Sequence, residues 1–249
     1  MRIERRRDLR RLIGSRRNGQ IKIITGIRRC GKSYLLGILY RDYLLQEGVP
    51  PEQIVTLELD NDVNARYRNP LELGAYLREK VSDTTKEFYI LLDEIQMVET
   101  VDNPYLPEDS GAAISFVDVL LGLKSLPNVD VYVTDSNSKM LSSDVATAFR
   151  DRGEEIHIDP LTYDDFYAAF PGEKRFAWRE FMTYGGMPMV LQKSTQADGI
   201  ARKTRKKASR YGRQRQDTDI YRQRRPDESG SQAGRQAETP RKRYNAVRK

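Results

Sequence analysis

The stretch TGIRRCGKS, residues 25–33, follows the apolar run IKII and opens a long segment of helical periodicity. It fits the pattern G-x-x-x-x-G-K-[ST], with the second glycine five residues after the first. In such a strand–loop–helix setting, glycines let backbone N–H groups curl around a phosphate, and the helix N-terminus adds a positive dipole. We therefore expect the loop to bind phosphate. The alternative is a basic turn that merely joins a strand to a helix.

Each polar residue of this loop has an expected role. Lys32 is predicted to neutralise the β- and γ-phosphate oxygens, and the Ser33 hydroxyl to ligate Mg²⁺. The only cysteine, Cys30, lies inside the loop, where its backbone rather than its thiol should matter. The residues expected to contact the nucleotide are Gly26, Arg28, Arg29, Cys30, Gly31, Lys32, Ser33 and Tyr34.

A second apolar run, FYILLDE (88–94), ends in two carboxylates. Ligands of open α/β sheets bind at the carboxyl ends of the strands, which is where Asp93 and Glu94 would be delivered. Asp93 is expected to hold the Mg²⁺, and Glu94 to polarise the attacking water as a general base. The alternative is that the pair only begins the next loop or caps a helix.

Polar side chains that follow a third apolar run complete the set of candidates. After VDVYVT (129–134), either Asn137 or Ser136 is placed to bind the γ-phosphate or to position the water. Further on, Arg150 and Arg152 are candidates for stabilising transition-state charge in a neighbouring subunit. The alternative for both arginines is a solvent-facing position at a helix end.

The spacing of these runs predicts the fold class. Strands rich in Ile, Val and Leu, fully apolar rather than alternating, indicate burial on both faces. They alternate with helical stretches from residue 20 to residue 134, which predicts a parallel sheet flanked by helices in an α/β fold. The polar loop 100–113 is expected to lie on the surface. Phe176, Trp178 and Phe181 are expected in the core of a small helical subdomain, and His157 is assigned no role.

The amino-acid composition limits the classes of protein to which the chain can belong. The 249 residues suffice for a real core, and the sequence contains no apolar stretch of membrane-spanning length. A single cysteine argues against a disulfide framework and favours a cytoplasmic location. The formal charge of +7 is uneven: residues 194–249 carry +11, which leaves −4 for residues 1–193, although residues 2–17 hold eight arginines.

Several segments taken together resemble a known family. TGIRRCGKS, YILLDEIQ (89–96), PLTYDDFY (160–167) and YGGMP (184–188) resemble prokaryotic AAA-type P-loop ATPases, in which an AAA domain precedes a C-terminal domain of unassigned function. The resemblance covers about residues 1–193. It implies a sheet in which the strand 129–134 separates the strand before the phosphate loop from the strand 88–93. By the family pattern, Asn137 matches the sensor position, and Arg150 with Arg152 matches an arginine pair.

The resemblance also suggests a division of the chain. A basic N-terminal helix (1–19) would precede the P-loop ATPase core (20–160) and a helical lid segment (161–193). The arginine-rich tail (194–249) has no periodicity and few apolar residues, so it is expected to be disordered. We interpret it either as a basic arm or as an out-of-frame reading of the family's continuation.

Two acidic residues depart from the family pattern. Asp135 and Asp151 stand where the family usually has glycine. A carboxylate beside a triphosphate is repelled electrostatically, so Asp135 is expected to weaken ATP binding or hydrolysis. The arginine-rich tail stands in place of the family's C-terminal continuation. We expect this third departure, like Asp135, to impair ATPase activity.

Three functions remain open on the sequence. The first is a Mg²⁺-dependent ATPase that drives a conformational change, with a homo-oligomer or a protein partner as the expected assembly. The second is a nucleotide-gated binding switch with little turnover, against which Glu94 argues. The third is a nucleic-acid-associated ATPase, against which the net charge of −4 on residues 1–193 argues. No membrane partner is expected.

Overall fold

The computed structural model describes residues 2–107, 110–136 and 147–191, all within one compact unit, Met1–Gly199. The basic tail expected at 194–249 lies outside the described residues. The main strands are β1 (Ile21–Thr25), β2 (Ile54–Glu58), β3 (Phe88–Asp93), β6 (Val129–Thr134) and β7 (Gly153–His157). The helices are α1 (Arg6–Gly14), α2 (Lys32–Tyr34), α3 (Arg41–Gln46), α4 (Pro70–Lys80), α5 (Phe116–Lys124), α7 (Tyr163–Ala169) and α8 (Ala177–Tyr184).

The five main strands form one parallel sheet in the order β2-β3-β6-β1-β7. Strand β6 therefore lies between β3 and β1, as the family resemblance implies. In the register of the sheet, Ile23 pairs with Val133 of β6 and with Glu155 of β7. Because all five strands run the same way, the carboxyl ends of β1, β3 and β6 meet at one edge of the sheet.

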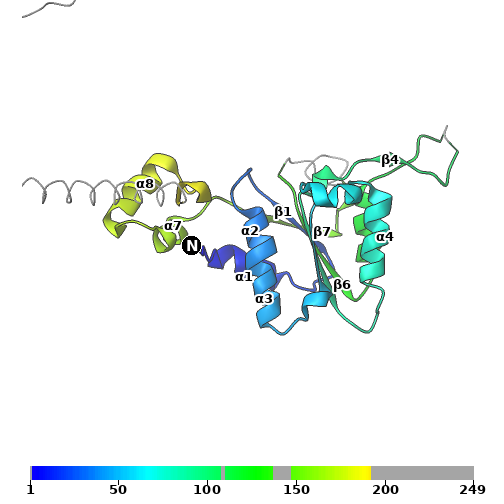
Figure 1. The fold of residues 1–249 in the computed structure, drawn as a ribbon, viewed down its shortest axis with the longest axis horizontal. Helices are drawn as coiled ribbons and strands as arrows, with labels where there is room; N and C mark the ends of the chain where they lie inside the picture. Colours follow the sequence, from blue (N-terminus) through cyan, green and yellow to red (C-terminus); the bar gives the residue numbers. More distant parts are fainter. Residues whose placement is uncertain (1, 108–109, 137–146, 192–249) are drawn as a thin grey trace, which may run out of the picture. The chain divides into compact units, whose positions relative to one another are not determined.

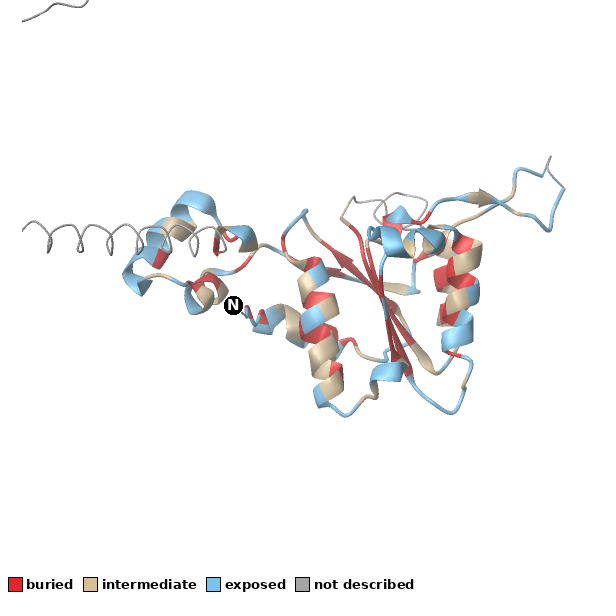
Figure 2. Ribbon diagram, viewed as in Figure 1, coloured by how far each residue is buried: buried red, intermediate tan, exposed pale blue. Residues whose placement is uncertain are grey.

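Helices cover both faces of this sheet. Figure 1 shows α2 and α3 on one side of the strands and α4 on the other. Strands β1 and β3 are buried along their whole length, while β2 and β7 at the two sides of the sheet are partly exposed (Figure 2). Neighbouring strand residues such as Leu91 and Leu92 enter different cores, which explains why β3 is apolar along its run instead of alternating.

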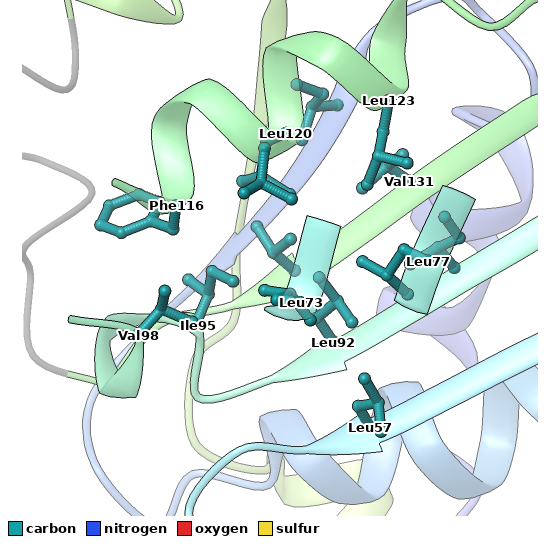
Figure 3. Packing of buried hydrophobic residues seen from close by; sticks show 14 of the residues in the cluster. Leu57, Leu73, Leu77, Leu92, Ile95, Val98, Phe116, Leu120, Leu123 and Val131 are labelled. Carbon is teal, nitrogen blue, oxygen red and sulfur yellow. The ribbon is translucent and has the colours of Figure 1, made fainter. Parts of the chain in front are cut away.

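The larger core joins the sheet to α4 and α5. Figure 3 shows leucines of both helices gathered over strand side chains. Its members in that view include Leu57, Leu73, Leu77, Leu92, Phe116, Leu120, Leu123 and Val131. On the opposite face, a second core joins the sheet to Leu12 of α1, to Leu44 of α3 and to the π-helical segment Leu35–Tyr40 that connects α2 with α3.

Two charges interrupt the apolar strands and neutralise one another. Lys22 of β1 is fully buried, and its ammonium forms an ion pair with Asp130 of β6. The Tyr132 hydroxyl donates to the other carboxylate oxygen of Asp130 at 2.9 Å, and the Tyr40 hydroxyl donates to that of Tyr132. Burying a charge is costly unless the charge is paired and hydrogen-bonded, and this network meets that condition.

Local signals mark the helix ends. Asn69 accepts a hydrogen bond from the Leu71 amide at 2.9 Å, and Pro70 occupies the first turn of α4. Ser115 and Asp118 form a capping box at the start of α5. Gly48, with φ of 84°, follows the end of α3 in the left-handed conformation that glycine tolerates.

The region after β7 is helical, as predicted, but its packing differs from the prediction. Phe166 of α7 is buried with Ile3 and Leu161, and Phe181 of α8 packs against this cluster. Trp178 is 55 % exposed and only edges against the Tyr163 ring at 5.0 Å between centroids. The placement of Trp178 in a core is therefore wrong, because α8 presents only one of its faces to α7. Phe176 is exposed as well.

The loop 100–113 begins and ends in a short pair of strands that its polar composition did not predict. Val101–Asp102 (β4) pairs antiparallel with Ala113–Ile114 (β5). The loop lies on the surface as expected, and Tyr105 is 84 % exposed. Every helix in the described ranges is too short or too polar to cross a bilayer.

Candidate functional site

The phosphate loop candidate begins at the carboxyl end of β1, the strand held between β6 and β7. Gly26 has φ of 141°, and a Cβ at this position would lie 2.3 Å from the Ile158 carbonyl oxygen. Gly31 has φ of 104°, a conformation that side chains of L-residues disfavour. Both glycines of the motif are therefore required by the backbone, whether or not a ligand is bound.

Lys32 occupies the centre of this loop. Its side chain is buried, and its ammonium donates to the carbonyl oxygens of Gly26 at 2.8 Å and Ile27 at 3.1 Å. No carboxylate among the described residues forms an ion pair with it. A buried cation held only by carbonyl oxygens is favourably placed to exchange them for an anion, so the loop suits a phosphate.

The remaining loop residues divide by exposure. Arg28 and Arg29 are exposed, and Arg29 has a left-handed φ of 64°. The Cys30 side chain is buried, and burial raises the pKa of its thiol, so only its backbone is available to a ligand. The Tyr34 hydroxyl accepts a hydrogen bond from the Ile3 amide at 3.1 Å, which ties the ring to the N-terminal segment.

Asp93 ends β3 beside Ser33 of α2. Its carboxylate accepts hydrogen bonds from the Thr134 hydroxyl at 2.6 Å and from Ser33. Burial raises the pKa of Asp93, and the nearby carboxylates of Glu94 and Asp60 add to the rise. A bound cation would stabilise the ionised carboxylate and so lower the pKa of Asp93 again. Hydroxyl and carboxylate oxygens are the ligands that Mg²⁺ prefers.

This donor set fits Mg²⁺ only in company with phosphate oxygens. In the described part of the chain, no group of three or more His, Cys, Asp or Glu side chains is arranged to hold a metal by itself. Ser33 and Asp93 supply one hydroxyl and one carboxylate. Mg²⁺ is usually bound by one or two protein oxygens together with water and substrate phosphates, so the pair fits a phosphate-dependent site.

Glu94 follows Asp93 in a strained conformation and is held by two donors. Its φ is 57°, in the left-handed region that costs a non-glycine residue about 1–3 kcal/mol. The Ser136 hydroxyl donates to its Oε2 at 2.6 Å, and the Gln96 amide nitrogen donates to the same atom. The Glu94 amide donates to the Thr134 hydroxyl at 2.9 Å. The carboxylate is thereby fixed at the shared edge of β3 and β6.

A pocket of about 320 Å³ lies against the start of the phosphate loop. It is lined by Thr25, Gly26, Ile27, Arg28, Asp135, Ser136 and His157. Asp135 is 2 % exposed and places a negative group on the wall of this pocket. His157 also belongs to it, and its Nδ1 lies 3.1 Å from the Thr25 hydroxyl, although the sequence assigned this histidine no role.

The two arginines lie at the opposite end of β1 from the phosphate loop. The Arg152 carbonyl accepts a hydrogen bond from the Ile21 amide at 2.9 Å, at the beginning of β1. The five residues of β1 separate this point from the phosphate loop. At 3.3 Å per strand residue, the separation along the strand is roughly 16 Å. Both arginines are exposed, and Asp151 between them has φ of 60°, a conformation that suits the family's usual glycine.

The sequence singled out some of these groups and missed others. The structure brings together, where the carboxyl ends of β1, β3 and β6 meet, the candidates Lys32, Ser33, Asp93, Glu94 and Ser136. Thr134 and Gln96 were missed, although each is the polar residue that breaks or follows an apolar run. Asn137 lies outside the described residues.

A family model described as an AAA domain matches residues 18–167. An uncharacterized protein of Haemophilus influenzae is 31 % identical over 194 residues, which cover 76 % of this chain and 44 % of that protein. An uncharacterized protein of Methanocaldococcus jannaschii is 27 % identical over 189 residues, which cover 69 % of this chain and 36 % of that protein. The chain thus spans less than half the length of both relatives.

Among solved structures, the ORC1 protein of Aeropyrum pernix in complex with DNA is similar in fold. The TM-score is 0.53 at 15 % sequence identity, over 82 % of this chain and 62 % of that one. At this identity the likeness supports the fold and not the DNA contact.

Proposed function

The chain belongs to the AAA-type P-loop ATPase family, and from this premise we propose that it binds ATP with Mg²⁺ and hydrolyses it to drive a conformational change. One observation carries the proposal. The buried Lys32 and the carboxylates of Asp93 and Glu94 converge at a single edge of the sheet, and Glu94 is held there by donors from neighbouring segments. A cationic loop explains binding, but an oriented carboxylate beside it explains hydrolysis.

Each residue has a distinct task in this proposal. Lys32 exchanges its bonds to the Gly26 and Ile27 carbonyls for phosphate oxygens, while Ser33 and Asp93 hold Mg²⁺. The metal supplies neutralising charge at the phosphates when it is bound. Glu94 accepts the proton of the water that attacks the γ-phosphorus.

The bond changes then balance without another reactant. The new bond joins the water oxygen to the γ-phosphorus, and the bond from that phosphorus to the β–γ bridging oxygen breaks. ADP and inorganic phosphate leave, and the proton held by Glu94 returns to solvent.

The arginine pair favours an assembly of several copies. Arg150 and Arg152 are exposed and lie at the far end of β1 from their own phosphate loop, so they can serve only a different copy of the site. We propose that they stabilise transition-state charge on ATP bound by a neighbouring chain.

A second candidate, a nucleotide switch with little turnover, is favoured by one observation. The Asp135 carboxylate lines the pocket beside the phosphate loop, where it opposes a triphosphate. Such a protein would bind ATP but release phosphate slowly.

Steady-state phosphate release separates these candidates. We expect release that requires ATP and Mg²⁺, is lost on chelation of the metal, and is unchanged by added DNA. Tight ATP binding without release would support the switch. Stimulation by DNA would support a nucleic-acid-associated ATPase, and the absence of both binding and release would refute the proposal.

Replacing Asp135 by glycine is expected to tighten ATP binding roughly tenfold. Two like charges roughly 12 Å apart repel by about 1.4 kcal/mol at an effective dielectric of ~20, and about 1.4 kcal/mol corresponds to tenfold in affinity. Asp135→Asn is the matched control, because it removes the charge and keeps the side-chain size. Equal gains in both variants assign the effect to charge. If neither variant changes the affinity measured by calorimetry, Asp135 does not act on the phosphate.

A further inference from the structure

Arg5 is a buried cation that the proposed mechanism does not use. It precedes α1, has φ of 41°, and its side chain is only 1 % exposed. Arginine is almost never fully buried unless its donors are paired. The N-terminal sequence RIERRRDLRR gives no sign that this arginine, among eight in residues 2–17, differs from the others.

The guanidinium of Arg5 joins three segments of the chain. Its Nε donates to the Asp8 carboxylate at 2.9 Å, and its Nη2 lies 2.7 Å from the same carboxylate. Its Nη1 donates to the Cys30 carbonyl of the phosphate loop, and its Nη2 donates to the Asp159 carbonyl between β7 and α7. All three guanidinium nitrogens therefore have partners.

The bond to Cys30 fixes the direction of a backbone donor in the loop. The Cys30 carbonyl and the Gly31 N–H belong to one planar trans peptide, so they point in opposite directions. While Arg5 holds the carbonyl on its side, the Gly31 N–H must point away from Arg5. Gly31 also lacks the Cβ that would lie 2.9 Å from the Arg5 Nη1, so the glycine makes this approach possible.

Charge alone does not explain the arrangement. The Asp8 carboxylate, 13 % exposed, lies against the guanidinium and offsets its positive charge. An ammonium could supply the same charge, but it lacks the planar fork that reaches three partners in fixed directions. Orientation is thus the property that only arginine provides here.

The geometry points to Arg5 as a positioning residue that aims the Gly31 N–H at the bound phosphate. This inference rests on the proposed ATP binding and adds an element outside the phosphate-loop motif. Arg5 touches no part of the nucleotide, and it acts through the Cys30–Gly31 peptide.

The test compares Arg5→Lys with wild type in calorimetric titrations of ATP and of inorganic pyrophosphate. Arg6→Lys is the matched control, because Arg6 is exposed and forms a surface ion pair with Glu4. We expect Arg5→Lys to weaken the binding of both ligands by a similar factor, about 10- to 100-fold for the loss of one charge-assisted hydrogen bond to phosphate. The control should stay within about twofold of wild type, as is usual for exposed pairs.

The outcomes are distinct. Wild-type affinity in a folded Arg5→Lys, checked by circular dichroism at the titration temperature, would overturn the inference. A selective loss of ATP but not pyrophosphate would overturn it as well, because the effect would then lie at the nucleoside. If wild type itself binds no ATP, the proposed function fails first, and the inference fails with it.

A measurement on wild type covers the case in which Arg5→Lys does not fold. Guanidinium protons of Arg5, protected by burial, can be followed by NMR while pyrophosphate is added. We expect their resonances and that of the Gly31 amide to shift together on saturation. Resonances of Arg5 that stay unchanged while the Gly31 amide shifts would overturn the inference.

Discussion

Replacing Lys32 by alanine is expected to weaken ATP binding by more than about 100-fold. The ammonium is buried at the centre of the phosphate loop, where it donates to the Gly26 and Ile27 carbonyls. Charge-assisted hydrogen bonds are worth roughly 1.5–3 kcal/mol each, and two of them to phosphate correspond to at least about two powers of ten. Isothermal calorimetry with ATP and Mg²⁺ measures the loss directly.

Lys80→Ala provides the control for this experiment. Lys80 is exposed at the end of α4, so its removal should leave ATP affinity unchanged. Unfolding by denaturant, without nucleotide, should show Lys32→Ala to be at least as stable as wild type. The reason is that the substitution removes a buried cation with no ion-pair partner among the described residues. Undiminished ATP affinity in Lys32→Ala would refute the assignment of the loop.

Replacing Glu94 by glutamine is expected to leave ATP binding intact and to reduce phosphate release by about 100- to 10,000-fold, the usual contribution of a general base. The amide keeps the size of the side chain and can still accept from Ser136, but it cannot take a proton. Single-turnover release with bound ATP measures the chemical step without interference from product release.

Glu99→Gln is the control for Glu94. It lies five residues further along the chain, is exposed, and should behave as wild type. Equal phosphate release by Glu94→Gln and wild type would make Glu94 structural, held by Ser136 and Gln96 for stability alone. Loss of ATP binding together with hydrolysis would mean that Glu94 supports the loop and not the water.

The sheet was predictable from sequence because its strands are buried on both faces. Runs such as IKIIT and FYILLD are apolar at nearly every position, which no half-exposed strand would be. The order of strands was not predictable from the runs themselves and came from the family resemblance. A lysine in a buried strand, such as Lys22, cannot be explained from the sequence of that strand alone. Its ion-pair partner is Asp130, 108 residues away.

The site was predictable where a motif fixes local geometry and not where contacts are distant. The loop residues and the Asp93–Glu94 pair follow from short patterns next to strands. Arg5 acts on Cys30 and Asp159, contacts of 25 and 154 residues in sequence separation, and no local pattern encodes them. Thr134 was missed because a threonine in a β-strand is an ordinary strand residue until its partner, Asp93, is known.

Strand β1 acquires its hydrogen-bonded neighbours only after roughly 100 further residues have been synthesised. It leaves the ribosome early, but one partner, β6, ends at Thr134 and the other, β7, ends at His157. Pairing across such separations requires the closure of long loops, which is slow. The phosphate loop therefore lacks its supporting strand pairs until more than 130 residues have been made. A nascent chain should accordingly be unable to capture ATP until β6 and β7 have both emerged.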